Sequence, residues 1–144
     1  MTNASRASKL WPNENWLALE QALARRGWVS LLCWGSNDEH ETNVRRAAQM
    51  QSARVLPRSS LTQIALLAAA ARVVVGLDTG LTHLAAAVGA PTVGIFCDYD
   101  PALVGLRGSG RVLSLGGVEQ MPTVEQVCGA VNRVLALPQA VAAD

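Results

Sequence analysis

Apolar positions change their spacing repeatedly along the chain. Short, nearly continuous apolar runs are typical of buried strands, whereas apolar residues that recur every three or four positions are typical of helices. The apolar runs predict strands at residues 28–34, 53–57, 72–77, 91–96 and 111–115. The helical spacing predicts helices at residues 13–26, 39–50, 61–71, 81–89 and 124–137. Strands and helices therefore alternate over almost the whole chain.

Capping signals support several of these helices. A Ser, Thr or Asp followed three residues later by an acid or Gln can satisfy the free N–H groups at a helix start. Such pairs precede three of the predicted helices: Asp38 with Glu41, Ser60 with Gln63, and Thr123 with Gln126. At the opposite ends, Gly27 and Gly89 are expected to end the first and fourth helices, because glycine readily adopts the left-handed conformation found there.

The predicted strands are almost wholly apolar, which favours a parallel sheet covered on both faces. The fold class expected is α/β, a doubly wound parallel sheet of the Rossmann-like kind. Ligands of such sheets bind beyond the carboxyl ends of the strands, next to helix N-termini. The segment Gly-Leu-Asp-Thr-Gly-Leu-Thr-His, residues 76–83, falls at such a place, between an apolar strand and an Ala-rich helix.

The polar residues of this segment have the composition of a phosphate or diphosphate site. A helix N-terminus carries unpaired backbone N–H groups and a partial positive charge, and it commonly binds phosphate. Gly80 would let the backbone approach the anion closely. Thr79 and Thr82 can add hydroxyl donors, and His83 can add a donor or a positive charge.

Two other interpretations compete for the same residues. Asp78 or Thr79 could simply cap the helix, with His83 as a structural histidine, and neither standard phosphate-binding glycine motif is present. The sequence Leu-Asp-Thr-Gly also resembles an aspartic protease. That chemistry needs two carboxylates that share a proton, so one such motif would require a dimer. Those proteases are all-β, and the Ala-rich helix after the motif argues against them.

Composition narrows the class of protein. The 144 residues suit one domain, and half of them are hydrophobic, enough for a core. The net charge of +1, with mixed signs, predicts no nucleic-acid partner. Cys33, Cys97 and Cys128 form no C-x-x-C pair, which indicates a reducing compartment rather than disulfides or zinc. The polar N-terminus predicts no signal peptide, and no apolar run approaches the roughly 20 residues that span a bilayer.

Several segments together resemble one family. Residues 73–96 match the pattern of a strand ending in Asp-Thr-Gly-x-Thr-His, followed by an Ala-rich helix and a second strand. The loop at 97–105 then matches an Asp-Pro-x-x-x-Gly pattern. Residues 5–19 contain Lys-x-Trp-Pro, and residues 34–41 contain a Trp-Gly loop with an acid. The chain thus resembles the lipopolysaccharide heptosyltransferases, family 9 glycosyltransferases of the GT-B fold. The loop departs from the family's Gly-Pro-Thr-Asp-Pro, since Cys-Asp-Tyr-Asp-Pro stands there.

The resemblance implies a donor substrate and the residues that hold it. The donor would be ADP-L-glycero-D-manno-heptose and the acceptor a Kdo sugar of lipid A, with inversion at the anomeric centre and no metal or other cofactor. The donor-binding set is Ser5 and Lys9 at the phosphates, Glu39 at the ribose or base, Asp78 beside the heptose, and Thr79, Gly80 and His83 at the diphosphate. Trp34 is the tryptophan considered for stacking on adenine.

The resemblance also implies that residues 1–144 are one half of an enzyme. A GT-B enzyme has two Rossmann-like domains, and the acceptor domain with its general base is the N-terminal one. The chain is therefore expected to be a single donor-binding domain without a catalytic base, incomplete alone, and part of a cytoplasmic enzyme that meets lipid A at the inner membrane's cytoplasmic face. Two alternatives stay open: a non-catalytic nucleotide-binding module, and another GT-B sugar-nucleotide enzyme.

Overall fold

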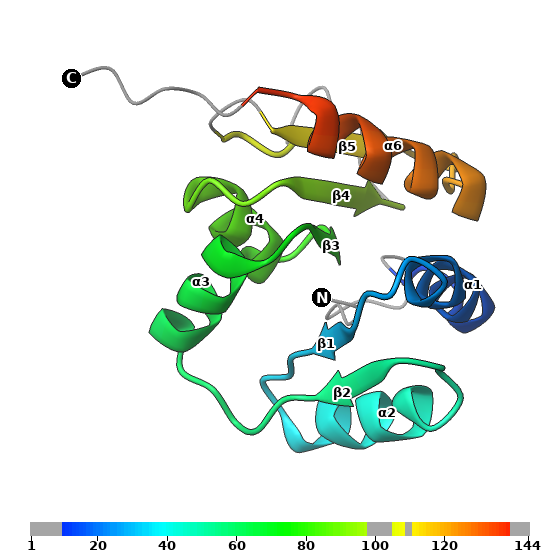
Figure 1. The fold of residues 1–144 in the computed structure, drawn as a ribbon, viewed down its shortest axis with the longest axis vertical. Helices are drawn as coiled ribbons and strands as arrows, with labels where there is room; N and C mark the ends of the chain where they lie inside the picture. The colour runs from blue at the N-terminus through cyan, green and yellow to red at the C-terminus, as the bar shows by residue number, and fades with distance from the viewer. Residues whose placement is uncertain (1–9, 98–104, 109–110, 139–144) are drawn as a thin grey trace.

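Helices and strands alternate in the computed structural model, which describes residues 10–97, 105–108 and 111–138 (Figure 1). In chain order the elements are α1 (Asn13–Ala24), β1 (Ser30–Leu32), α2 (Asn37–Ala47), β2 (Ala53–Val55), α3 (Leu61–Ala70), β3 (Val74–Leu77), α4 (Gly80–Ala87), β4 (Thr92–Phe96), β5 (Val112–Gly116) and α6 (Val124–Ala136). Each predicted strand and helix has its counterpart among these elements, and the α/β fold class is confirmed.

The strands pair only in parallel, as expected, but they form two sheets rather than one. The first sheet has the order β1-β2 and the second the order β3-β4-β5. The prediction of a buried strand at residues 28–34 was wrong in extent and in burial. Only Ser30–Leu32 form β1, while Val29 and Leu31 are about half exposed. The physical reason is position, because β1 ends its sheet and its apolar side chains border a groove instead of another strand.

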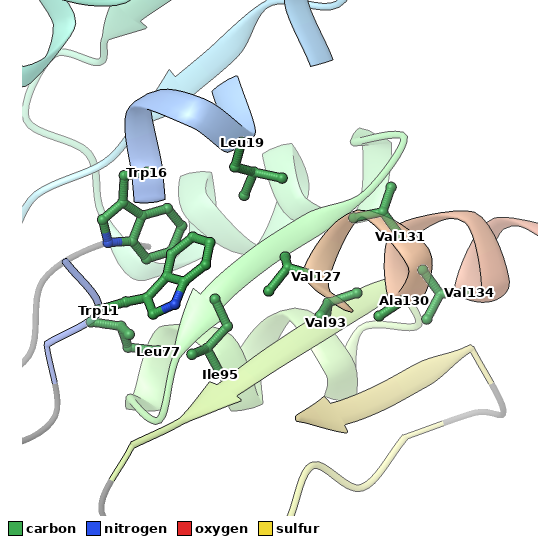
Figure 2. Packing of buried hydrophobic residues seen from close by; sticks show 10 residues of the cluster. All are labelled: Trp11, Trp16, Leu19, Leu77, Val93, Ile95, Val127, Ala130, Val131 and Val134. Atoms are coloured by element: carbon green, nitrogen blue, oxygen red, sulfur yellow. The ribbon is translucent and has the colours of Figure 1, made fainter. Parts of the chain in front are cut away.

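The main core lies between the second sheet and two helices, α1 and α6. Figure 2 shows the α6 side chains pointing towards β4, whose Val93 and Ile95 are fully buried. On the opposite face of β4, Phe96 packs with Ala86 of α4. Successive side chains of a strand point to opposite faces, so β4 supplies both cores at once. This explains why β4 is buried along its whole length.

Trp11 links the start of α1 to the segment between β5 and α6. Its indole N–H donates to the carbonyl oxygen of Pro122 at 2.9 Å, and its ring meets the edge of Trp16 with centroids 4.9 Å apart. Both rings are buried in the core shown in Figure 2. A buried tryptophan normally needs a partner for its N–H, and Trp11 has one from a segment more than a hundred residues away.

The helix starts confirm most of the capping predictions. Full capping boxes join Ser60 to Gln63 at α3 and Thr123 to Gln126 at α6. The predicted box of Asp38 with Glu41 was wrong, because α2 begins at Asn37 and is capped by Ser36 together with Glu39. Ser36 lies in the extended conformation that an N-cap requires, whereas Asp38 lies inside the first turn, where its charge favours the helix N-terminus.

Polar contacts hold α2 against the rest of the chain. The guanidinium Nε of Arg46 donates to the side-chain oxygen of Asn13 at 2.8 Å, and Asn43 donates to the carbonyl oxygen of Cys33 at 2.9 Å. Burial lowers the pKa of Arg46, since desolvation disfavours its charged form. The Asn43 contact also holds the loop that follows β1, where Trp34 lies, against α2, whose first turn contains Glu39. None of the helices among the described residues is long and apolar enough to cross a membrane.

Candidate functional site

The polar segment of residues 76–83 lies where the sequence predicts it, at the carboxyl end of β3. Asp78 follows β3 and its backbone N–H donates to the carbonyl oxygen of Ile95, which extends the pairing with β4 by one residue. Thr79 is the extended N-cap residue, and α4 begins at Gly80. The carboxyl end of a parallel strand is thus joined directly to a helix N-terminus, the usual place for a ligand in an α/β sheet.

The N-terminus of α4 has no side-chain cap, in contrast to the capping boxes of α2, α3 and α6. The Thr79 hydroxyl lies 3.3 Å from that of Thr82 instead. The first helical N–H groups with an acceptor are those of Thr82 and His83, which donate to the Thr79 carbonyl oxygen. Within the described part of the chain, the N–H groups of Gly80 and Leu81 have no recorded acceptor. They are the donors an anion would meet.

Gly80 is exposed, and neither packing nor backbone conformation explains why a glycine stands there. Among the described residues, a Cβ placed on Gly80 would meet no atom within 4 Å, and Gly80 is not among the glycines with positive φ. The described part of the chain therefore leaves the space over the start of α4 open. A glycine that the fold does not need fits a position where a ligand approaches the backbone closely.

Asp78 and His83 form a pair across the first turn of α4. The His83 Nε2 lies 3.0 Å from Asp78 Oδ1, with the histidine side chain 43% exposed and the aspartate 17%. Because a carboxylate can only accept, Nε2 carries the proton in this contact. The other ring nitrogen then bears a proton only when the imidazole is charged. A histidine held in this way can donate to a phosphate only as the imidazolium ion.

Sequence reasoning did not foresee this pair, although a signal was available. Two ionisable side chains that flank a helix start can meet across its first turn. Thr82, considered as a hydroxyl donor, is fully buried, so it does not offer its hydroxyl at the open surface. Thr79 remains partly accessible and keeps its place beside the uncapped N–H groups.

The Glu39 carboxylate caps the start of α2. Its Oε2 accepts hydrogen bonds from the N–H groups of Gly35 at 2.6 Å and Ser36 at 3.3 Å, which completes the cap of α2. Trp34 in the same loop donates its indole N–H to the Leu56 carbonyl oxygen at 2.6 Å, and its ring centroid lies 4.5 Å from that of His40. A contact between Glu39 and a ribose or base stays a prediction, for which the second carboxylate oxygen would serve.

The remaining predicted positions lie outside the described residues. They are Ser5 and Lys9, together with residues 98–104 of the loop that follows β4. The structure therefore brings together Asp78, Thr79, Gly80 and His83, and it places Glu39 on a helix that follows the other sheet.

Known proteins resemble this chain in sequence and in fold. The model of the family described as glycosyltransferase family 9 (heptosyltransferase) matches residues 1–132. The chain belongs to this family. The resemblance inferred from the sequence is thereby confirmed. The expected fold is confirmed too, because solved heptosyltransferase structures superpose on the chain.

The similar proteins are longer than this chain. Lipopolysaccharide heptosyltransferase 1 of Pseudomonas aeruginosa is 39% identical over 121 residues, which cover 84% of the chain and 34% of that relative. A solved structure of E. coli heptosyltransferase WaaC with ADP has a TM-score of 0.85 at 31% identity, covering 93% of the chain and 42% of that protein. A second, with ADP-2-deoxy-2-fluoro heptose, has a TM-score of 0.75, also at 31% identity, covering 92% and 40%. The chain thus spans about a third of the curated relative, 34%.

Proposed function

We propose that this chain is the donor-binding part of a heptosyltransferase, which holds the ADP portion of ADP-L-glycero-D-manno-heptose at the start of α4. One observation carries the proposal: an uncapped helix N-terminus, opened by a glycine that the fold does not need, lies at the carboxyl end of a parallel strand. Family membership supports it, because related structures were solved with ADP and with an ADP-heptose analogue.

The chemistry expected of this site is the stabilisation of a leaving diphosphate. Breaking the bond between the sugar and ADP leaves negative charge on the phosphate oxygens. The Gly80 and Leu81 N–H groups and the positive end of α4 would stabilise that charge without reorganisation during the reaction. Lys9 is proposed to add a positive charge, and Ser5 a hydroxyl donor, at the phosphates.

The Asp78–His83 pair fits a position between phosphate and sugar. A lone carboxylate would repel a diphosphate, but a protonated His83, whose Nε2 lies 3.0 Å from Asp78 Oδ1, would offset that charge. His83 would then donate to the phosphate through its other nitrogen. The second oxygen of Asp78 would accept a hydrogen bond from a sugar hydroxyl. The aspartate would thus bind the sugar, and the histidine would bind the phosphate.

The other steps belong to residues outside this chain. Deprotonation of the acceptor hydroxyl, and binding of a Kdo sugar on lipid A, are assigned to a second, N-terminal domain at the cytoplasmic face of the inner membrane. A non-catalytic nucleotide-binding module is the second candidate.

The isolated chain should transfer no heptose. The general base and the acceptor surface are assigned to another domain, so turnover of ADP-heptose onto Kdo-lipid A by these 144 residues should stay at background. Supplying the N-terminal half of a relative in trans is the positive arm of the assay. Turnover by the chain alone would refute the division into two halves, and no turnover with the added half would favour the non-catalytic module.

ADP should bind without a divalent metal. The donors proposed at the start of α4 are backbone N–H groups and a protonated His83, which would contact phosphate directly and need no bridging ion. Titration calorimetry with ADP in EDTA should give a dissociation constant within about twofold of that with added Mg²⁺. Absence of heat at millimolar ADP, or heat only with Mg²⁺, would contradict the site as proposed.

Substitutions of His83 and Asp78 should separate phosphate from sugar. His83→Ala should weaken ADP about fivefold, the value of one hydrogen bond of ~1 kcal/mol. Asp78→Asn keeps an acceptor for the ring and removes a negative charge, so ADP binding should change less than twofold while ADP-heptose weakens relative to ADP. Both are measured by calorimetry. Loss of ADP binding in Asp78→Asn, with an unchanged circular dichroism spectrum, would make Asp78 part of the phosphate site's scaffold instead.

A further inference from the structure

The His83 ring has one nitrogen engaged and one available. Its Nε2 lies 3.0 Å from Asp78 Oδ1, whereas Nδ1 has no recorded partner in the described part of the chain. Side chains of a helix lean towards its N-terminus, so the ring covers the first turn of α4, where the N–H groups of Gly80 and Leu81 have no recorded acceptor. The side chain is 43% exposed. A phosphate bound at this helix start would therefore meet Nδ1.

Asp78 determines which charge state of the ring can use Nδ1. A carboxylate only accepts, so the proton between the two side chains sits on Nε2. A neutral ring then has a lone pair at Nδ1, which cannot donate to a phosphate oxygen and is repelled by it. A second proton, on Nδ1, turns this repulsion into a charge-assisted hydrogen bond. Because an imidazole in water titrates at about pH 6.5, that proton has to be taken up over much of the neutral range.

We infer that ADP binding is coupled to proton uptake by His83. Asp78 holds the ring in the tautomer that lacks a donor towards the phosphate, so the ring takes a proton from solvent as ADP binds and returns it when ADP leaves. Asp78 is thus a positioning residue for the phosphate, since it acts through the ring. The inference rests on the proposed function, because it places the diphosphate at the start of α4. It adds a proton that stays beside the leaving phosphate during transfer.

Among the described residues, few other ionisable groups surround the ring. The elements packed most extensively against α4 are α3, β3 and β4, and none of them contains an ionisable residue. Asp78 follows β3 and the Cys97 thiol follows β4, while Arg107 lies in a segment that contacts the opposite end of α4. Lys9, proposed at the phosphates, lies outside the described residues. Asp78 is therefore the described charge that controls the His83 ring.

The size of the effect follows from the His83 hydrogen bond. A charged ring should strengthen ADP binding about fivefold over His83→Ala, whereas a neutral ring should add nothing. The affinity ratio of wild type to His83→Ala should therefore be about fivefold at about pH 5.5 and fall towards one by about pH 8.5. The sign follows because the protonated ring binds better, so its contribution is lost as the pH rises. Linkage limits the uptake to about 0.4 proton per ADP, reached near about pH 7.

Calorimetry with ADP at about pH 7, in two buffers of different ionisation enthalpy, measures this uptake. Wild type should take up about 0.4 proton more than His83→Ala. The terminal phosphate of ADP also titrates in this range, and the difference between the two proteins removes its contribution. Equal uptake by two proteins that both bind ADP would overturn the inference and leave the phosphate site in place. No ADP binding at any pH would overturn both.

Asp78→Asn separates the tautomer from the contact. An amide can donate as well as accept, so it can donate to Nε2 and leave the ring proton on Nδ1. A neutral His83 then donates to phosphate, and the affinity ratio to His83→Ala should lose its pH dependence. The variant should bind ADP within about twofold of wild type at about pH 5.5 and up to about fivefold more tightly at about pH 8.5.

Glu125→Gln is the matched control for this substitution. It makes the same carboxylate-to-amide change in the first turn of another helix, α6, and should follow wild type at both pH values. A merely structural role of Asp78 would give a loss of affinity that is equal at the two pH values. That outcome, or an unchanged pH dependence in Asp78→Asn, would overturn the inference.

The tautomer can also be observed without ADP. The chain has two histidines, so NMR signals of the ring nitrogens are assigned with His40→Gln. At about pH 8.5, where a free imidazole is neutral, His83 should carry its proton on Nε2 in the wild type and shift it towards Nδ1 in Asp78→Asn. A wild-type ring with its proton on Nδ1 would overturn the inference, whatever the titrations with ADP show.

Discussion

Replacing Gly116 with alanine should destabilise the fold by roughly 2–5 kcal/mol. Gly116 ends β5 with φ at +93°, a backbone conformation that side chains with a Cβ rarely adopt. The new Cβ would also collide with the carbonyl oxygen of Phe96 and lie 3.1 Å from that of Gln120. The Phe96 carbonyl cannot move away freely, because it accepts a hydrogen bond from Gly117 at 3.0 Å. Conformational strain and collision therefore act together.

Urea unfolding followed by circular dichroism measures the effect, and Gly129→Ala is the matched control. Gly129 lies inside α6, and a Cβ there would meet no atom within 4 Å. Alanine is the better helix former, so this variant should be more stable by up to ~1 kcal/mol. The two variants add the same methyl group with opposite expected signs. An unchanged unfolding midpoint in Gly116→Ala would show that the end of β5 can rearrange.

The parts of the fold that the sequence predicts well are those encoded by neighbouring residues. The capping boxes at α3 and α6 were predicted because their residues are only three positions apart. At α2 two overlapping pairs, Ser36 with Glu39 and Asp38 with Glu41, both fit the pattern. Only the observed hydrogen bonds show that Ser36 caps the helix. Local signals thus locate a helix, and the tertiary setting decides its first residue.

The arrangement of strands could not be predicted in the same way. An apolar run shows that residues 28–34 favour a strand, but it does not say which strands will pair with it. The apolar pattern predicts Leu31 as a core residue. In the structure its side chain is about half exposed, because β1 ends its sheet. Pairing depends on contacts between segments far apart in the chain, and the apolar pattern of one segment does not identify its partner.

In the candidate site, too, local features could be predicted from the sequence, whereas contacts between side chains could not. The place of Asp78, Thr79 and Gly80 followed from a strand–helix junction, which is a local feature. The spacing of Asp78 and His83 allows a hydrogen bond across the first turn of α4, but the side-chain conformations that form it are not determined by the residue types. Glu39 was assigned to the nucleotide through family resemblance, while the structure shows its carboxylate capping α2.

Replacing Gly80 with valine should weaken ADP binding at least tenfold, about 1.4 kcal/mol, and leave the fold intact. The lost ADP affinity and the unchanged stability are both expected from the open space beside Gly80. No atom of the described residues lies within 4 Å of a Cβ at this position, so there is room for the side chain. Valine is also a better helix former than glycine. The same space is where phosphate oxygens would approach the N–H groups of Gly80 and Leu81. A branched side chain there covers both donors.

Calorimetry with ADP, beside a urea unfolding curve for each protein, separates the two effects. Gly80→Ala should fall between the wild type and the valine variant, because its smaller side chain covers less of the helix start. Gly129→Ala, far along the chain on α6, should bind ADP as the wild type does and serves as the matched control. Since the unfolding midpoint of Gly80→Val should not fall, lost affinity cannot be attributed to unfolding. Wild-type affinity in Gly80→Val would mean that ADP does not contact the N-terminus of α4, and the phosphate site would have to be sought elsewhere on the sheet's carboxyl edge.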